Sequence, residues 1–171
     1  MKQRSTCRTI LSLAAYIILA LVVAYIITHN YPPSLAVGIQ APLDNKLTNL
    51  NGSALGLNNF KRPLLINFWA TWCTPCQQEL PILSRAAKKY ANQITFIGAA
   101  VDSAHADIIS TKNNLGLDYI ISEASPHVVK TWHAELLPTT YLVDTKGTIV
   151  WAHAGLLSEE ELQKALDLVL K

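Results

Sequence analysis

The segment that decides the fold reads Phe68-Trp69-Ala70-Thr71-Trp72-Cys73-Thr74-Pro75-Cys76. An apolar run, typical of a buried strand, leads into it, and residues with helical periodicity follow it. The spacing predicts that both sulfur atoms lie in the first turn of a helix. Free N–H groups and the helix dipole lower a thiol pKa from its usual value of roughly 8.5 at that place. We expect Cys73, nearer the solvent, to be the nucleophile and the deeper Cys76 to resolve the mixed disulfide.

Two separated motifs resemble one family. They are Leu65-Ile66-Asn67-Phe68-Trp69-Ala70-Thr71-Trp72-Cys73-Thr74-Pro75-Cys76-Gln77-Gln78-Glu79-Leu80-Pro81 and Leu137-Pro138-Thr139-Thr140-Tyr141-Leu142-Val143-Asp144. Together they resemble the thioredoxin-like proteins of the TlpA, ResA and DsbE type, which are bacterial, membrane-tethered thiol-disulfide oxidoreductases. The resemblance covers residues 37–171. It implies that the working group is a redox-active Cys73–Cys76 disulfide, with no other cofactor.

Strands and helices alternate along the second part of the chain. The expected strands cover residues 63–69, 94–101, 118–122, 139–144 and 148–153, and the expected helices cover 73–92, 104–114, 126–134 and the segment from 158 onward. This order predicts an α/β, thioredoxin-like fold with a central mixed sheet and helices on both faces. Weak strand-like stretches around 41–43 and 47–50, with a turn signal at Asn51-Gly52, predict an N-terminal β-hairpin extension.

The N-terminal part divides into three segments before the domain. Residues 1–9 are basic, and residues 10–27 form an uncharged apolar run that is about 27 Å long as a helix, close to the thickness of a bilayer core. We predict a cytoplasmic N-terminus over 1–9, a transmembrane anchor over 10–28, a linker over 29–36 and the domain over 37–171. Lys and Arg before the run, with none after it until Lys46, place the domain outside the cell or in the periplasm. The alternative is a signal peptide cleaved near Ser34-Leu35-Ala36.

Composition excludes several classes of protein. The formal charge is +2, but Lys2, Arg4 and Arg8 before the apolar run contribute +3, so the rest of the chain is close to neutral and we expect no nucleic-acid binding. Cys7 precedes the apolar run, which leaves one cysteine pair and excludes a disulfide-stapled scaffold. A zinc site needs two further ligands beside that pair, and the five His residues are scattered, so we expect no metal. Nothing in the sequence indicates obligate dimerisation, and we expect a monomer.

A peroxidase is the nearest alternative on a similar fold. Peroxiredoxins place a Thr three residues before the reactive Cys, whereas Ala70 occupies that position here. A structural disulfide is the other alternative, but such a bond rarely opens a helix directly after an aromatic corner. Redox activity of the cysteine pair is therefore the favoured interpretation.

Pro138 is the second expected member of the site. The resemblance implies a cis Leu137–Pro138 bond opposite the cysteines, which leaves the backbone of Leu137 free to pair with an extended substrate peptide. Leu137 then contacts the substrate and shields the sulfur atoms. The alternative is an ordinary trans proline at the start of a strand.

Asn67 stands where cytosolic thioredoxins carry a buried Asp, and an Asn side chain cannot exchange a proton with Cys76. Glu79 lies three residues beyond Cys76, on the same helix face, and members of the resembling family have a Glu there. If it is buried, its pKa rises and it can act as a general acid or base near neutrality. The alternative is a solvated helix residue.

The remaining site residues surround the cysteines. We expect Trp69 in the core and Trp72 on the exposed apolar surface that receives partners. Thr74 and Pro75 lie between the cysteines, where they contact the substrate and tune the reduction potential.

The favoured function is reduction of disulfides in partner proteins outside the cytoplasm. By resemblance, the partners include apocytochrome c, and a membrane protein of the DsbD or CcdA kind supplies the electrons. One alternative is an oxidase that donates its disulfide to folding proteins. Another is a non-catalytic module that presents a peptide-binding groove.

Overall fold

The structure, a computed structural model, describes residues 16–23 and 37–170. Residues 16–23 form a helix in a unit separate from the domain. The predicted segment 1–9, the predicted linker 29–36 and most of the predicted anchor 10–28 lie outside the described residues. Within 16–23 and 37–170, no helix combines the length and apolar character that a membrane crossing requires.

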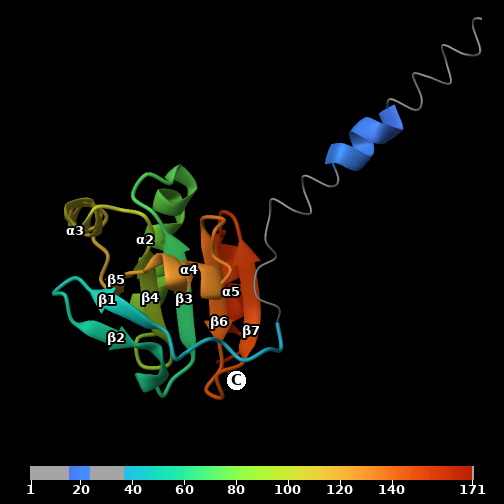
Figure 1. Cartoon of the computed structure of the whole chain (residues 1–171). Coiled ribbons are helices and arrows are strands. Elements are labelled where there is room, and N and C mark those ends of the chain that lie inside the picture. Colours follow the sequence, from blue (N-terminus) through green and yellow to red (C-terminus); the bar gives the residue numbers. More distant parts are fainter. Residues whose placement is uncertain (1–15, 24–36, 171) are drawn as a thin grey trace, which may run out of the picture. The chain divides into compact units, whose positions relative to one another are not determined.

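A mixed seven-stranded sheet forms the centre of the domain, in the order β2-β1-β5-β4-β3-β6-β7 (Figure 1). The strands are β1 (Lys46–Asn49), β2 (Ala54–Gly56), β3 (Leu64–Trp69), β4 (Thr95–Ala100), β5 (Ile120–Glu123), β6 (Thr139–Val143) and β7 (Ile149–Ala154). Strands β3, β4 and β5 are parallel, and the other pairings are antiparallel. The mixed sheet that the sequence predicts is confirmed.

Helices cover both faces of this sheet, as predicted. They are α2 (Thr74–Lys89), α3 (His105–Asn114), α4 (Pro126–Thr131) and α5 (Glu159–Leu166), with the short 3₁₀ helix η1 (Leu57–Asn59) before β3. The connections β3-α2-β4 and β4-α3-β5 run in the same direction across the sheet, whereas β5-α4-β6 runs back. Because crossovers between parallel strands are right-handed, α2 and α3 lie on one face. Helix α4 lies on the other face, where Val128 and Val129 join the cluster that contains Phe68. Apolar side chains of α5 join the α2 face.

Strand β3 is buried on both faces, which fixes the position of everything that follows it. Ile66 and Phe68 pack on the α4 side with Trp132, and Leu65 and Trp69 pack on the α2 side. Trp69 is fully buried, so its predicted place in the core is confirmed.

The N-terminal hairpin differs from the prediction in one of its strands. The turn at Asn51-Gly52 joins β1 to β2, which follows the turn, and β1 also pairs with β5. Residues 41–43 are not a strand. Pro42 has no N–H to donate to a ladder, and nearby Gln40 makes only an isolated bridge to Thr148.

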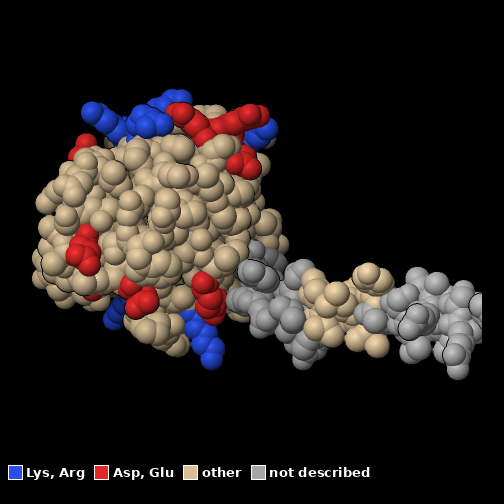
Figure 2. Space-filling view, turned by 90° about the horizontal axis from the view of Figure 1, so that it is seen from above, with Lys and Arg blue, Asp and Glu red and all other residues tan. Residues whose placement is uncertain are grey.

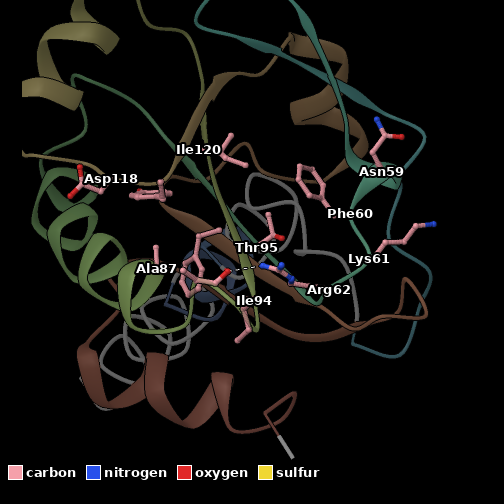
Figure 3. A pocket seen from close by; sticks show the side chains of 12 residues that line it. Asn59, Phe60, Lys61, Arg62, Ala87, Ile94, Thr95, Asp118 and Ile120 are labelled. Carbon is pink, nitrogen blue, oxygen red and sulfur yellow. Dashed lines mark hydrogen bonds between the residues drawn. The ribbon is translucent and has the colours of Figure 1, made fainter.

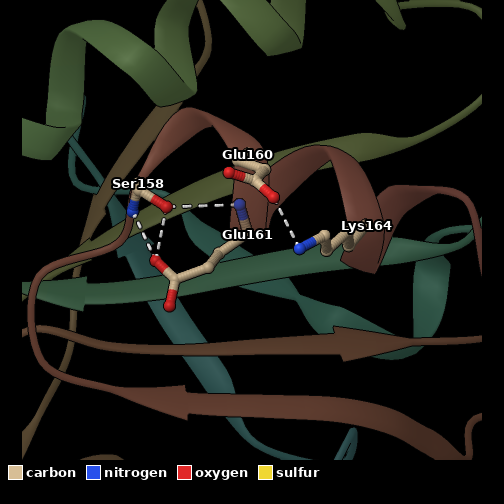
Figure 4. A network of polar contacts seen from close by, with 4 residues as sticks. All are labelled: Ser158, Glu160, Glu161 and Lys164. Atoms are coloured by element: carbon tan, nitrogen blue, oxygen red, sulfur yellow. Dashed lines mark hydrogen bonds and ion pairs between the residues drawn. The ribbon is translucent and has the colours of Figure 1, made fainter.

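A capping box formed by Ser158 and Glu161 begins α5 (Figure 4). The Ser158 side chain accepts from the Glu161 N–H at 3.2 Å, and the Ser158 N–H donates to Glu161 Oε2 at 3.0 Å. Glu160 pairs with Lys164 one turn further along the helix. This cap fixes the segment just before α5, which reaches the candidate site.

Candidate active site

The end of β3 and the start of α2 hold the two cysteines. Helix α2 begins at Thr74, one residue later than predicted, so Cys73 is its N-cap and only Cys76 lies in the first turn. The cysteines form a disulfide with their Cα atoms 5.3 Å apart, and the Cys76 N–H donates to Cys73 Sγ at 3.3 Å. Cys76 is fully buried, whereas Cys73 is 6% exposed. The predicted order of depth is confirmed, and the Cys76 N–H that points at the outer sulfur favours a thiolate there.

The Leu137–Pro138 bond is cis, which confirms the prediction. Strand β6 begins directly after it, and Thr139 pairs with Phe68 near the end of β3, so the cis bond lies beside the strand that leads to the cysteines. Leu137 packs against the cluster that contains both of them. Its N–H and C=O have no hydrogen-bond partner among the described residues. A short backbone edge is therefore available next to the disulfide.

Trp72 is 63% exposed, as predicted, but its ring is held in place. Its Nε1 donates to the carbonyl of Asp102 at 2.8 Å, and the N–H of Thr71 donates to Ser103 Oγ at 3.0 Å. Asp102 has a φ of 42°, an unusual backbone conformation for a residue other than glycine. The loop after β4 thereby fixes an apolar side chain beside Cys73.

Glu79 is fully buried beneath the cysteines, which excludes the solvated alternative. Asn67 Nδ2 donates to Glu79 Oε1 at 2.7 Å, and the N–H of Leu157 donates to Oε2 at 2.9 Å. Burial raises the pKa of Glu79 from 4.5 to about 7, against the lowering effect of the hydrogen bonds from Leu157 and Asn67. The carboxyl group can therefore give or take a proton near neutrality.

Two contributors to this site were missed by the sequence reasoning. The N–H of Leu157 is a backbone group with no signature in the sequence. Tyr119 approaches the carboxyl from the segment before β5, and burial and the Glu79 charge both raise its pKa. For Tyr119, the sequence offers one signal, which is Gly98 in the middle of β4. A glycine inside a strand often marks a place where another group approaches the backbone closely.

Two cavities lie at opposite ends of the parallel strands. One of about 520 Å³ lies at their N-terminal ends, beside Phe60, and Arg62 Nη1 there donates to the Ala91 carbonyl at 2.7 Å (Figure 3). The other, of about 660 Å³, follows the C-terminal ends of β4 and β5 and is lined by Asp102, Glu135 and their neighbours. Only the second adjoins the Trp72 loop and the segment that leads to the cis bond.

The end of the domain seen in Figure 2 carries few charged side chains, and these gather at its rim. Exposed apolar side chains on the loops around the disulfide include Trp72 and Leu136. Among the described residues, no group of three His, Cys, Asp or Glu side chains is placed to hold a metal ion. The arrangement is suited to contact with a polypeptide.

Known proteins share this fold and these motifs. The sequence pattern of the AhpC/TSA family matches residues 37–152. The thioredoxin-like protein YneN of Bacillus subtilis is 33% identical over 135 residues, which cover 77% of this chain and 79% of that protein. The thiol-disulfide oxidoreductase ResA of Geobacillus kaustophilus is 26% identical over 166 residues, 94% of this chain and 95% of that one.

A solved structure gives the same fold. The secreted disulfide oxidoreductase of Mycobacterium tuberculosis that is homologous to E. coli DsbE has a TM-score of 0.68 and 21% identity, over 74% of this chain and 96% of that one. At this identity the likeness concerns the fold. The chain therefore belongs to the AhpC/TSA family, with the thioredoxin-like thiol-disulfide oxidoreductases of the ResA type.

Proposed function

We propose that this protein reduces disulfide bonds of partner proteins outside the cytoplasm, through the Cys73/Cys76 pair and without a further cofactor. The observation that carries the proposal is the position of the disulfide. It lies at the start of α2, next to the cis Leu137–Pro138 bond and above the buried carboxyl of Glu79. A nucleophile, an edge for the partner and a proton acceptor are thus within one site.

The reaction starts from the dithiol form. The Cys73 thiolate attacks one sulfur of the partner disulfide, and the partner's other sulfur leaves as a thiolate and takes a proton. Cys76 then attacks Cys73 Sγ, and its proton passes to the Glu79 carboxylate. The second partner sulfur leaves as a thiolate and takes the proton that Glu79 accepted, directly or through the solvent. The partner thus gains two electrons and two protons while the Cys73–Cys76 disulfide forms.

The partner binds as an extended segment along the cis-proline loop. Its backbone pairs with the N–H and C=O of Leu137, next to Pro138. Thr74 and Pro75 contact it between the cysteines, and Trp72 covers its apolar side chains. The cavity beside Asp102 gives room for residues that flank the disulfide.

The cellular setting follows from the N-terminal sequence. An uncleaved anchor over 10–28, with the basic residues 1–9 in the cytoplasm, holds the domain as a monomer at the outer side of the cell membrane. The match to ResA over 94% of this chain extends into this segment and supports the assignment. Apocytochrome c is the proposed partner, and a membrane protein of the DsbD or CcdA kind is the proposed electron donor.

A trapping experiment tests the site. The Cys76→Ser variant lacks the resolving thiol, so we expect it to accumulate mixed disulfides with partner proteins in cells, visible as bands that a reductant removes. The matched Cys73→Ser variant should form none. Adducts on both variants, or on neither, would contradict the assignment of the nucleophile. A double Cys→Ser variant that still complements a deletion strain would instead identify a binding module.

The direction of electron flow needs a separate measurement. In a Cys7→Ser background, acid quenching and thiol alkylation report the steady-state redox form of the pair. We expect a mostly reduced pair, because electrons are supplied across the membrane. A mostly oxidised pair would favour the oxidase alternative.

A further inference from the structure

Three buried polar atoms beneath the disulfide have no hydrogen-bond partner among the described residues. They are Asn67 Oδ1, Trp69 Nε1 and Tyr119 Oη. Asn67 and Trp69 are fully buried, and the Tyr119 hydroxyl is shielded from solvent although its ring is partly exposed. An unpaired buried polar group costs about 1–3 kcal/mol, so three in one region require an explanation.

The three atoms lie on the same face of the sheet, over Gly98. In the pairing of β3 with β4, Asn67 lies beside Gly98, and Trp69 is two residues further along the same face. A Cβ atom on Gly98 would lie 3.1 Å from Trp69 Nε1 and 3.3 Å from Tyr119 Cε2. The same Cβ would lie 2.8 Å from Ile121 Cδ1, so the absence of a side chain on Gly98 lets the indole and the phenol pack closely over β4.

The orientation of the Asn67 amide completes this arrangement. Its Nδ2 donates to Glu79 Oε1 and, at 2.9 Å, to Thr140 Oγ1 on β6. Strand β6 flanks β3 on the side opposite to β4. Because the amide oxygen and nitrogen diverge from one carbon, Oδ1 turns to the β4 side, toward Gly98.

The chemistry of the three atoms matches one small ligand. The indole N–H only donates, the amide oxygen only accepts, and the phenol can do either. A water molecule can accept from Trp69 Nε1, donate to Asn67 Oδ1 and exchange a hydrogen bond with Tyr119 Oη. The water then makes three hydrogen bonds, which is about the number that buried waters usually make. A cation does not fit beside an indole N–H that points at it.

We propose that Asn67 Oδ1, Trp69 Nε1 and Tyr119 Oη bind an internal water molecule over Gly98, and that this water fixes the Asn67 amide in the orientation that donates to Glu79. Tyr119 and Trp69 are then positioning residues that act through Asn67. The functional part of this inference rests on the proposed role of Glu79, whereas the water site itself can be tested on the resting oxidised protein.

The groups that face the Glu79 carboxyl set the expected effect. Asn67 donates to it from β3 and the N–H of Leu157 from the segment before α5, while Cys76 precedes it on α2 and Tyr119 approaches from the segment before β5. If Asn67 Oδ1 loses its hydrogen bond to the water, the amide is less firmly oriented, and its hydrogen bond to the Glu79 carboxylate weakens. The protonated form of Glu79 then gains relative to the charged form.

A high-resolution crystal structure of the oxidised full-length protein tests the site. We expect a water within about 2.7–3.2 Å of all three atoms. Direct hydrogen bonds among the three side chains, with no water between them, would overturn the proposal.

A Tyr119→Phe variant tests the consequence, because it keeps the ring and removes only the hydroxyl. We expect the Glu79 titration midpoint, followed by the carboxyl ¹³C shift in the full-length oxidised chain, to move upward by roughly half to one pH unit. The control is Tyr90→Phe, which removes a hydroxyl bonded to Gln163 at the far end of α2 and should leave the midpoint unchanged. An unchanged midpoint in Tyr119→Phe would overturn the positioning role.

These outcomes are separable from the proposed function. The structure and the titration require no partner and no turnover, so they can succeed or fail while the trapping experiment gives the opposite result. A Gly98→Ala variant adds a third readout, since its Cβ would lie 2.8 Å from Ile121 Cδ1 and 3.1 Å from Trp69 Nε1, which forces these side chains to shift. We expect it to displace the water and to raise the Glu79 midpoint, and a water retained there would contradict the assigned position.

Discussion

Glu79 supplies the ionisable carboxyl group that Asn67, its hydrogen-bonded neighbour on β3, lacks. Asn67 occupies the strand position and donates one hydrogen bond, while the acid itself comes from the helix that carries the cysteines. Burial raises the pKa of Glu79 to about 7 because the charged form loses its hydration. The proposed proton acceptor is thus placed on α2, the same rigid element that carries Cys76.

A Glu79→Gln substitution should remove the acid–base step and keep the shape of the side chain. We expect the rate of insulin reduction at pH 7.5 to fall by about 10²-fold, since general acid–base groups contribute factors of this size. In the wild type the rate should fall as the pH drops through about 7, where the carboxylate becomes protonated. In the variant this inflection should disappear.

The matched control is Glu160→Gln on the exposed surface of α5, where the same change removes a surface ion pair with Lys164. Its pH profile should follow that of the wild type. An inflection near pH 7 that persists in Glu79→Gln would assign the titration to another group.

The same carboxyl should make the stability of the oxidised protein depend on pH. The pKa of Glu79 is about 7 in the folded state and near 4.5 in the unfolded chain, so between these values the folded state binds more protons. Stability therefore falls as the pH rises from about 4.5 to 7, by about 3 kcal/mol in total. Urea unfolding at pH 5 and pH 8 measures this difference, and Glu79→Gln should lose most of it.

At the scale of elements, the segment that begins α5 helps to hold the Glu79 carboxyl in place, although it is remote from Glu79 in the sequence. The capping box fixes Ser158, and the preceding Leu157 donates its N–H to Glu79. The cap therefore does two things. It satisfies the free N–H groups of α5 and it holds one hydrogen-bond donor against the buried carboxyl.

A Ser158→Ala substitution should lower the free energy of unfolding by about 1 kcal/mol, as is typical for the loss of an N-cap. Urea unfolding at pH 7 is the measurement. Ser110→Ala, in the exposed part of α3, is the comparison and should change stability little. Equal effects of the two substitutions would show that the cap does not stabilise the fold.

The junction of β3 and α2 exposes Trp72, which we propose contacts partner proteins. Because this side chain is 63% exposed, Trp72→Ala should affect binding more than stability. We expect kcat/KM for a protein disulfide to fall by about tenfold, the effect of a central aromatic interface residue, and the rate with oxidised glutathione to stay nearly constant. Leu168→Ala, an exposed apolar residue after α5, is the control. An equal loss with both substrates would place Trp72 in the chemistry instead.

At the scale of the whole molecule, the proposed topology separates Cys7 from the other two cysteines by a membrane. In intact cells pretreated with a reductant, a membrane-impermeant maleimide should therefore label the outer Cys73 but not Cys7. After permeabilisation Cys7 should react as well. Labelling of Cys7 in intact cells would reverse the orientation, and a chain that lacks Cys7 altogether would indicate a cleaved signal peptide.

Local spacing made much of the site predictable. The strand before Cys73, the helix that begins after it and the place of Glu79 one turn beyond Cys76 all follow from short-range periodicity. The resemblance to a known family added the cis bond before Pro138. The N-terminal hairpin shows where such reasoning fails, because the turn at Asn51-Gly52 was correct while one of its strands was assigned to residues before it.

The sequence by itself determined the order of strands and helices, the cysteine pair at the head of α2 and the residue types available for chemistry. Only the tertiary structure decided which distant groups meet. Leu157 reaches Glu79 across 78 positions of the chain, and Tyr119 and Trp69 meet over Gly98 because three neighbouring strands adopt one register. Short-range patterns are fixed by the geometry of the backbone. Contacts between remote segments depend on how whole elements pack, and no local pattern encodes that packing.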